Sequence, residues 1–277
     1  MLTYNRAEHI GDSIRSILNQ SYENLELVIN DDKSTDNTEK ICKEFEKKDE
    51  RVKYYRNSEN VGYAENNNLA IERANYEKVG LVHDGDIYHK HLVQKWVEQI
   101  SADDDIAIVF QGHRRRGADR ILNFSGIIDG QKLLDKMLRQ WGSPIFGIAM
   151  VRKTYVQNLG GFDPVFPRRS DVDMWMRLLN HYDAAYIDEA LIDIAPREDN
   201  HDLKGISWEY VRNLSNIRRI NINRRYKYDP KTLNKYMNKF HKDRRKKYCK
   251  MILRAFIKMK WSKVREGFKV LSNLDSF

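Results

Sequence analysis

A short acidic segment, HDGDIY (residues 83–88), follows the apolar run at residues 79–82. Its two carboxylates, Asp84 and Asp86, flank one glycine, and carboxylate oxygens are ligands that Mg²⁺ and Mn²⁺ prefer. Gly85 has no Cβ, so it would allow a diphosphate to approach the backbone closely. The segment therefore indicates a divalent cation that binds substrate phosphates. The alternative is an ordinary Asp-Gly turn.

A second acidic pair, Asp31 and Asp32, comes directly after the strand-like run at residues 25–29 and Asn30. A carboxylate at this place can accept a hydrogen bond from a nucleobase N–H. The helix start that follows can offer backbone N–H groups to an anion. The alternative is that the pair caps the next helix, although Ser34 and Asp36 are also suitable for that role.

A third acidic pair, Asp171 and Asp173, lies at a helix start shortly after the turn sequence GGFDP (residues 160–164). A carboxylate at such a place acts as a general base if it reaches a substrate hydroxyl. The alternative is that both acids stabilise the first turn of the helix through the helix dipole. By themselves the two residues leave both interpretations open.

The elements that must position these acids alternate between helical and strand periodicity. The spacing predicts helices at about residues 9–20, 41–45, 64–74 and 92–100, and strands at residues 25–29, 52–55, 79–82 and 106–110. This alternation is typical of a three-layer α/β/α domain with a mostly parallel sheet. Ligands of such sheets bind at the carboxyl ends of the strands. The pairs Asp84/Asp86 and Asp31/Asp32 are therefore expected to face one crevice. Residues 111–150 show a less regular pattern of apolar residues.

The composition indicates a globular protein. Among the 277 residues, 41% are hydrophobic and 32% are charged, which excludes wholesale disorder. The apolar runs fall far short of the roughly 20 residues that span a bilayer. There are two cysteines, Cys42 and Cys249. Two cysteines form no disulfide framework or cysteine-rich zinc site, so a reducing, cytoplasmic compartment is expected.

The net charge of +9 conceals an uneven distribution along the chain. Residues 201–277 contain 22 Lys and Arg against 6 Asp and Glu, whereas the rest of the chain contains 27 basic and 34 acidic residues. We therefore predict an acidic domain over residues 1–204 and a basic helical extension over residues 205–277. A protein built for nucleic acids is not usually charged in this way, so no nucleic-acid partner is expected. The extension is either a helical cap packed on the domain or a peripheral contact with an anionic membrane.

The order of the motifs resembles that of family 2 glycosyltransferases. The resemblance is carried by five segments: TYNR (residues 3–6), IRSILNQ (14–20), NDDKSTDNT (30–38), HDGDIY (83–88) and GGFDPVFPRRSDVDMWMRL (160–178). It extends from residue 3 to about residue 200. It implies a GT-A (Rossmann-like) fold and an inverting transfer from a nucleotide sugar, most often a UDP-sugar.

The resemblance also implies roles for individual residues. Nucleotide contacts are implied for Thr3, Asp31, Asp32 and Asp84. Asp84 and Asp86 match the motif that binds Mn²⁺ or Mg²⁺, and Asp171 matches the catalytic base. Asp173 is the neighbouring acid, which is expected to support the helix.

Three features depart from the family pattern. Only Met1 and Leu2 precede Thr3, where the family has a full first strand, so we expect a truncated first strand. Ser170 stands where the family often has Glu, which leaves Asp171 as the candidate base. Gly85 replaces one of three acids that the family often has at the metal motif, so the division of roles between Asp84 and Asp86 stays open.

The resemblance implies that an acceptor hydroxyl attacks the anomeric carbon while a metal-bound nucleoside diphosphate leaves. The acceptor would be a glycan or a lipid-linked sugar, and the reaction would belong to the synthesis of a surface polysaccharide or glycoconjugate. The expected location is the cytoplasm, at the inner face of the membrane. Two alternatives stay open: a nucleotidyltransferase, or a non-catalytic module that binds a sugar nucleotide.

Overall fold

The computed structural model describes residues 1–139, 143–167, 169–195, 208–227 and 229–257, together with residues 263 and 266. The chain divides into two compact units, residues 1–198 and residues 199–277. The boundary predicted between residues 204 and 205 lies among residues 196–207, outside the described residues. Each unit is considered by itself below.

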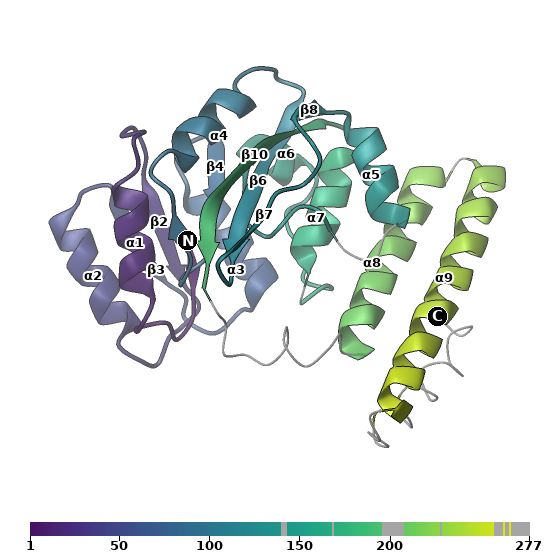
Figure 1. The fold of residues 1–277 in the computed structure, drawn as a ribbon. Helices are drawn as coiled ribbons and strands as arrows, with labels where there is room; N and C mark the ends of the chain where they lie inside the picture. The colour runs from purple at the N-terminus through teal and green to yellow at the C-terminus, as the bar shows by residue number, and fades with distance from the viewer. Residues whose placement is uncertain are drawn as a thin grey trace. The chain divides into compact units, whose positions relative to one another are not determined.

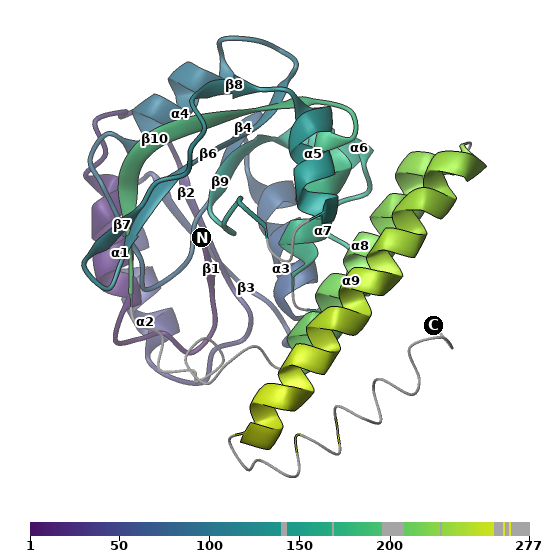
Figure 2. The same ribbon diagram turned by 45° about the vertical axis from the view of Figure 1, so that its right-hand side comes forward.

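The first unit is built on a mixed β-sheet (Figures 1 and 2). Strands β1 (Leu2–Thr3), β2 (Leu27–Asp31) and β3 (Val52–Arg56) pair in parallel. A parallel bridge between Leu2 and His83 joins them to the larger set of strands. That set has the order β4 (Lys78–Leu81), β9 (Ala149–Arg152), β6 (Ile106–Arg115), β10 (Asp183–Ile194), β5 (Ile87–Tyr88). Two short strands, β7 (Ala118–Arg120) and β8 (Gly126–Ile128), pair with β6 and β10.

Helices cover both faces of this sheet and complete the three layers (Figures 1 and 2). One face carries α1 (Ile10–Leu18), α2 (Thr38–Lys48) and α4 (Leu92–Ile100). The other carries α3 (Tyr63–Arg73), α5 (Gly130–Arg139), α6 (Lys153–Asn158) and α7 (Ser170–Leu179). The α/β fold predicted from the sequence is confirmed.

The helices that were predicted from spacing form because their apolar residues share one face. In α4, for example, Leu92, Trp96 and Ile100 are all fully buried, as the period of 3.6 residues requires. Strand β6 extends five residues beyond the predicted run, to Arg115. Its last residues pair with β7 in an exposed hairpin, where Arg114 forms an ion pair with Asp119 at 2.8 Å. Helix α5 and strands β9 and β10 were not predicted.

Strand β1 is only two residues long. Strand β1 pairs with β2 opposite Asn30 and Asp31, and the Met1 amino group donates a hydrogen bond to the Val28 carbonyl at 2.7 Å. Strand β4 pairs with β9 along its length, and His83 just beyond its end bridges to Leu2. The sheet is therefore continuous at the carboxyl ends of these strands, where the predicted site lies.

The second unit consists, within the described residues, of the helices α8 (Trp208–Tyr226) and α9 (Pro230–Ile257). The two helices contact each other. Arg218 of α8 places its guanidinium 5.5 Å from the centre of the Phe240 ring of α9. None of the described helices of this chain combines the length and apolar composition that crossing a bilayer requires.

Candidate functional site

The carboxyl ends of β2, β1 and β4 bring the predicted nucleotide residues into one neighbourhood. Thr3 at the end of β1 stands opposite Asp31 at the end of β2, and Leu2 bridges to His83 at the end of β4. Thr3 therefore lies between the two acidic motifs that the sequence separates by about fifty residues. Its hydroxyl is buried and has no hydrogen-bond partner among the described residues.

The pair Asp31 and Asp32 is buried, and both carboxylates already accept hydrogen bonds. Asp31 accepts from the Ser34 backbone N–H at 2.8 Å and from the Tyr54 hydroxyl at 2.6 Å. Burial and this hydrogen bond raise the pKa of Tyr54, so its hydroxyl stays protonated and donates. Asp31 therefore stabilises the turn between β2 and α2, while its implied contact with a nucleotide stays a prediction.

Asp32 fixes the loop that leads into α3. Its carboxylate accepts hydrogen bonds from the backbone N–H groups of Val61 and Gly62 at 2.8 and 2.9 Å, and from the side-chain amide of Asn57 at 3.0 Å. Gly62 has a φ of 82°, which favours glycine. The resemblance implied that this carboxylate faces a base. The geometry gives it a clear structural role and leaves the base contact as a prediction.

The turn that carries Asp84 and Asp86 is fixed by Ser13 of α1. The Ser13 hydroxyl donates to the backbone carbonyl of Asp86 and accepts from the Gly85 N–H, both at 2.8 Å. Gly85 has a φ of 91°, a conformation that favours glycine over other residues. The backbone conformation of the turn therefore explains why a glycine stands between Asp84 and Asp86, where the family often has an acid. The sequence did not reveal this conformation.

The two carboxylates of this turn differ in environment. Asp86 is almost completely buried, and its Oδ1 accepts a hydrogen bond from the Ala195 N–H at 3.1 Å. The Asp84 side chain is 12% exposed, and its Oδ1 lies 3.7 Å from Nε of Arg6. Asp84 is therefore the more accessible of the two to a ligand, and Asp86 connects the turn to the end of β10.

Asp84 and Asp86 are the two candidate ligands for a substrate-bound cation. Within the described ranges, no three His, Cys, Asp or Glu side chains form a group that could hold a metal ion. A Mg²⁺ ion in a nucleotide site is typically held by one or two carboxylates together with substrate phosphates. Asp84 and Asp86 supply that number of protein ligands.

Asp171 approaches the HDGDIY turn beside Gly147. A Cβ atom built on Gly147 would lie 3.0 Å from Cε1 of His83 and 3.2 Å from Oδ2 of Asp171. The base candidate from α7 and the first residue of the acidic turn therefore face the same small space, which Gly147 leaves open. Gly147 could not be selected from its residue pattern, because it lies in the irregular segment before β9.

Burial raises the pKa of the Asp171 carboxyl above its ordinary value. The nearby Arg169 charge and the backbone N–H groups of Val172 and Asp171 act in the opposite direction and only partly compensate. A carboxylate that is costly to ionise is a stronger base once it is ionised, which suits proton abstraction from a hydroxyl. Its neighbour Ser170 is fully buried, and the Ser170 hydroxyl has no hydrogen-bond partner among the described residues.

Asp173 has a structural role, as expected. It is fully buried, and its Oδ2 accepts a hydrogen bond from Nε of Arg177 at 2.7 Å. Arg177 then donates to the backbone carbonyls of Leu159 and Gly161, both at 2.7 Å. This network holds the glycine turn against α7, and thereby fixes the start of the helix that presents Asp171.

Asn68 of α3 supports the same turn from the other side, and sequence reasoning missed it. Its side-chain carbonyl accepts from the Phe162 N–H at 2.7 Å, and its amide donates to the Phe162 carbonyl at 3.0 Å. A Cβ on Gly161 would lie 2.7 Å from the Asn68 carbonyl oxygen, so this contact requires glycine there. The turn is thus held between α3 and α7.

Aromatic side chains surround the space beside Gly147. The Phe146 ring stacks on His113 with their centres 5.3 Å apart, and it meets the His83 ring edge-on at 6.5 Å. Tyr63 of α3 meets the other side of His83 at 6.2 Å. These rings restrict the position of the backbone at Gly147.

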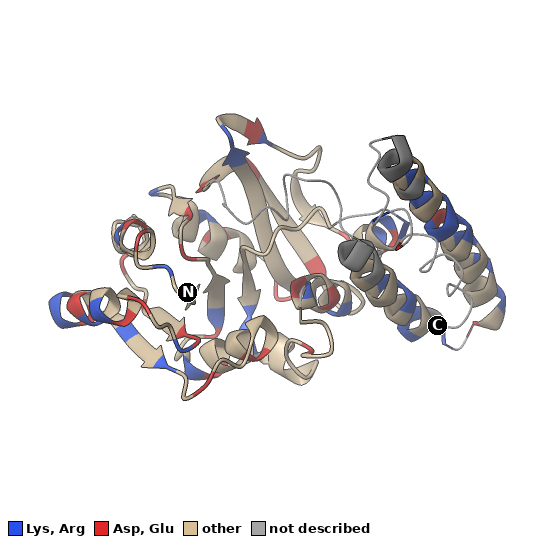
Figure 3. Cartoon of the chain, turned by 90° about the horizontal axis from the view of Figure 1, so that it is seen from below, with Lys and Arg blue, Asp and Glu red and all other residues tan. Residues whose placement is uncertain are grey.

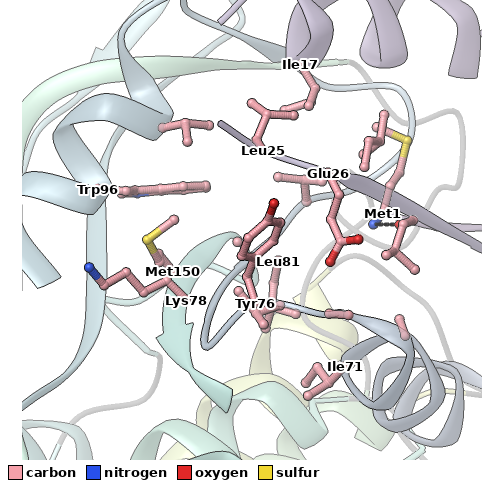
Figure 4. A pocket seen from close by; sticks show the side chains of 18 of the residues that line it. Met1, Ile17, Leu25, Glu26, Ile71, Tyr76, Lys78, Leu81, Trp96 and Met150 are labelled. Carbon is pink, nitrogen blue, oxygen red and sulfur yellow. Dashed lines mark hydrogen bonds between the residues drawn. The ribbon is translucent and has the colours of Figure 1, made fainter. Parts of the chain in front are cut away.

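A cavity of about 360 Å³ lies elsewhere in this unit, between the amino-terminal parts of β2 and β4. Figure 4 shows its lining, in which Trp96, Leu81, Ile71 and Met150 supply apolar surface around Glu26 and Lys78. It occupies the place where β2 and β4 have no strand between them. None of the six residues predicted to bind nucleotide, bind metal or catalyse lines it, whereas Leu2 and His83, which border the candidate site, do.

Comparison with known proteins identifies the family. The family model described as "Glycosyl transferase family 2" matches residues 1–160. The chain belongs to this family. The glycosyltransferase resemblance seen in the sequence is therefore confirmed.

Two curated relatives from Bacillus subtilis (strain 168) illustrate the similarity. The putative teichuronic acid biosynthesis glycosyltransferase TuaG is 34% identical over 117 residues, which cover 42% of this chain and 46% of TuaG. The putative glycosyltransferase EpsE is 28% identical over 217 residues, which cover 75% of this chain and 74% of EpsE. The match thus spans less than half the length of TuaG.

Among solved structures, S. aureus TarS 1–349 in complex with UDP-GlcNAc is similar in fold. The TM-score is 0.61 at 16% sequence identity, with 99% of this chain and 90% of that chain covered. The α/β architecture of this family 2 member is therefore the GT-A fold, as expected.

Proposed function

We propose that this chain transfers a sugar from a UDP-sugar to an acceptor hydroxyl with inversion of the anomeric configuration, in the synthesis of a surface polysaccharide or glycoconjugate. The observation that carries the proposal is the approach of Asp171 to the HDGDIY turn beside Gly147. A base on one side of a space and a phosphate-binding turn on the other is the arrangement that a single displacement needs.

The donor is assigned to the edge formed by β1, β2 and β4. Thr3, with its buried and unpartnered hydroxyl, is proposed to contact the nucleoside together with Asp31 and Asp32. The likeness to TarS, which was solved with UDP-GlcNAc bound, supports a UDP-sugar as the donor class. The similarity to a glycosyltransferase named for teichuronic acid synthesis supports a glycan or lipid-linked acceptor.

Asp84 and Asp86 would hold Mn²⁺ or Mg²⁺ together with the diphosphate of the donor. The cation would stabilise the negative charge that develops on the leaving diphosphate. Ser13 fixes the turn that presents both carboxylates.

Asp171 is proposed to accept the proton of the attacking hydroxyl. The acceptor oxygen forms a bond to the anomeric carbon while the bond from that carbon to the diphosphate oxygen breaks, and the diphosphate leaves with the electron pair. Because the oxygen attacks opposite the leaving group, the configuration inverts, and no nucleophile of the enzyme is needed. The raised pKa of Asp171 favours this proton transfer.

A thermal-shift screen of nucleotide sugars with and without Mn²⁺ tests the donor class. A ligand that binds only the folded state raises the melting temperature by mass action. We expect UDP-sugars to raise it in the presence of Mn²⁺, and an assay of UDP release to show turnover of the same donors.

Two other outcomes would replace the proposal. Release of pyrophosphate from a nucleoside triphosphate and a sugar phosphate would identify a nucleotidyltransferase. Binding of a UDP-sugar without turnover, in the presence of Mn²⁺ and a panel of acceptor glycans, would identify a non-catalytic binding module.

A further inference from the structure

One face of helix α9 consists of evenly spaced lysines. Lys231, Lys235, Lys239, Lys242, Lys246 and Lys250 are all exposed. Their spacing of four, four, three, four and four residues places them within an arc of about 100° on an α-helix. They extend over about 28 Å along the helix axis at 1.5 Å per residue. We call this set the lysine face.

The side chains on the opposite face of α9 are buried. Phe240, Arg244 and Tyr248 are buried, and they lie about half a turn away from the lysine face. The Phe240 ring is contacted by the guanidinium groups of Arg244 at 5.3 Å and of Arg218 of α8 at 5.5 Å. Burial of these three side chains fixes the rotation of α9, so the lysine face points away from α8.

The lysine face carries no compensating acid. Among the described residues, no Asp or Glu forms an ion pair with any of its six lysines. The acidic residue within α9 is Asp243, which faces Arg218 of α8 closely enough to oppose the loss of its charge. Like charges in a row repel one another, so a partner of negative charge would relieve that repulsion.

The chemistry of this face fits a lipid surface better than a nucleic acid. All six residues are lysines, which act as compact hydrated charges, whereas arginine is preferred for bidentate contacts with phosphates of nucleic acids. Among the α9 side chains whose exposure the structure describes, no exposed one is an aromatic ring on which a base would stack. A straight row of ammonium groups about 28 Å long matches a flat, anionic headgroup layer.

We propose that the lysine face of α9 is the docking surface of this chain on an anionic lipid bilayer. The contact is electrostatic and peripheral, since the face offers six lysine charges (Lys and Arg are blue in Figure 3), with the exposed Leu253 within the same arc. The inference rests on α9 alone and does not depend on the proposed transfer reaction.

Sedimentation of the full chain with vesicles tests the proposal. We expect binding to vesicles of 70% phosphatidylcholine and 30% phosphatidylglycerol at low salt, as about 1 kcal/mol per lysine near such a surface implies. Binding should be lost in 0.5 M NaCl and absent with pure phosphatidylcholine. The variant K235Q/K239Q/K242Q/K246Q should lower the partition coefficient by roughly 100-fold or more.

Matched variants show whether vesicle binding depends on the lysine face or only on the net charge of the protein. The variant K40Q/K47Q/K48Q/K53Q removes four exposed lysines from α2 and β3 and should bind vesicles like the wild type. Replacement of the same four α9 lysines by arginine should preserve binding. Circular dichroism of each variant reports whether the fold is retained, so a loss of binding is not mistaken for unfolding.

Several results would overturn the proposal. These are no vesicle binding by the folded wild type at low salt, equal binding by the folded α9 and control glutamine variants, or preferential binding to duplex DNA over vesicles in competition. None of these measurements includes a nucleotide sugar. Failure of the docking proposal therefore leaves the transferase proposal standing, and the reverse also holds.

Discussion

Asp171 of α7 and His83 of the acidic turn lie on either side of Gly147, each within 3.2 Å of the point that a Cβ of residue 147 would occupy. His83 follows β4 and Gly147 precedes β9, and these two strands are neighbours in the sheet, whereas Asp171 comes from α7. The segment that leads into β9 passes between them with a glycine at the point of closest approach. This relationship joins the proposed donor side and the proposed base into one site.

Replacing Asp171 by asparagine removes the proposed base while it preserves the size of the side chain. We expect Asp171→Asn to reduce transfer by roughly 100-fold or more, as the loss of a general base does. The affinity for UDP in the presence of Mn²⁺ should be unchanged, which calorimetric titration measures. Transfer at the wild-type rate would show that Asp171 is not the base.

The raised pKa of Asp171 also predicts how stability depends on pH. The folded state holds the proton more tightly than the unfolded state, so Asp171 destabilises the fold increasingly as pH rises from about 4 through its raised pKa. Asp171→Asn removes this cost. The melting temperature of the variant relative to wild type should therefore increase with pH and level off above the raised pKa of Asp171. A difference that shrinks as pH rises would contradict the assignment.

The space beside Gly147 predicts a second variant that impairs turnover. In Gly147→Ala the new methyl group meets His83 and Asp171 at 3.0 and 3.2 Å, so both side chains must shift by some tenths of an ångström. Small displacements of reacting groups cost roughly 10- to 100-fold in rate, and we expect a fall of that size in kcat with nucleotide binding retained.

A matched substitution at another glycine controls for the general effect of replacing glycine by alanine. In Gly11→Ala the new Cβ comes no closer than 3.4 Å to any atom, and its neighbour is the flexible Arg15 guanidinium. That variant should turn over like the wild type. Full activity in Gly147→Ala would mean that the space beside residue 147 is not used in the reaction.

We expect UDP binding to depend on a divalent metal ion through Asp84 and Asp86 of the acidic turn. UDP binding should require Mn²⁺ or Mg²⁺ and be lost on addition of a chelator. Asp84→Ala and Asp86→Ala should each abolish the difference between titrations with and without metal. Asp12→Ala, which removes an exposed carboxylate of α1, should retain the difference. UDP affinity that is the same with and without chelator in the wild type would remove the metal from the proposal.

Only one residue separates Asp173 from Asp171, but we expect its replacement to lower the stability of the fold, whereas replacement of Asp171 lowers the rate of transfer. Removing a partner from a buried ion pair costs about 3–5 kcal/mol, and Asp173 pairs with Arg177 without any exposure to solvent. Asp173→Ala should therefore lower the free energy of unfolding by about that amount, measured by urea denaturation. The exposed Asp188→Ala should stay within about 0.5 kcal/mol of the wild type.

The order of helices and strands in the first hundred residues could be predicted because their apolar residues follow local periods. Ile10, Ile14 and Ile17 of α1 are buried at helical spacing, for instance. The segment from residue 111 to 194 could not be predicted equally well. Its strands β9 and β10 obtain their neighbours from distant parts of the chain, and pairing of that kind has no local signature.

The sequence by itself determined which acids are available, that two of the three pairs follow strands, and that the basic residues gather near the end of the chain. Residue type and period are local properties, so they can be read without a fold. Only the tertiary structure decided that Ser13 fixes the Asp84 turn, that Asp32 is engaged by the loop before α3, and that Gly147 opens the space between His83 and Asp171. Those relationships depend on distances between elements that meet only when the sheet is assembled.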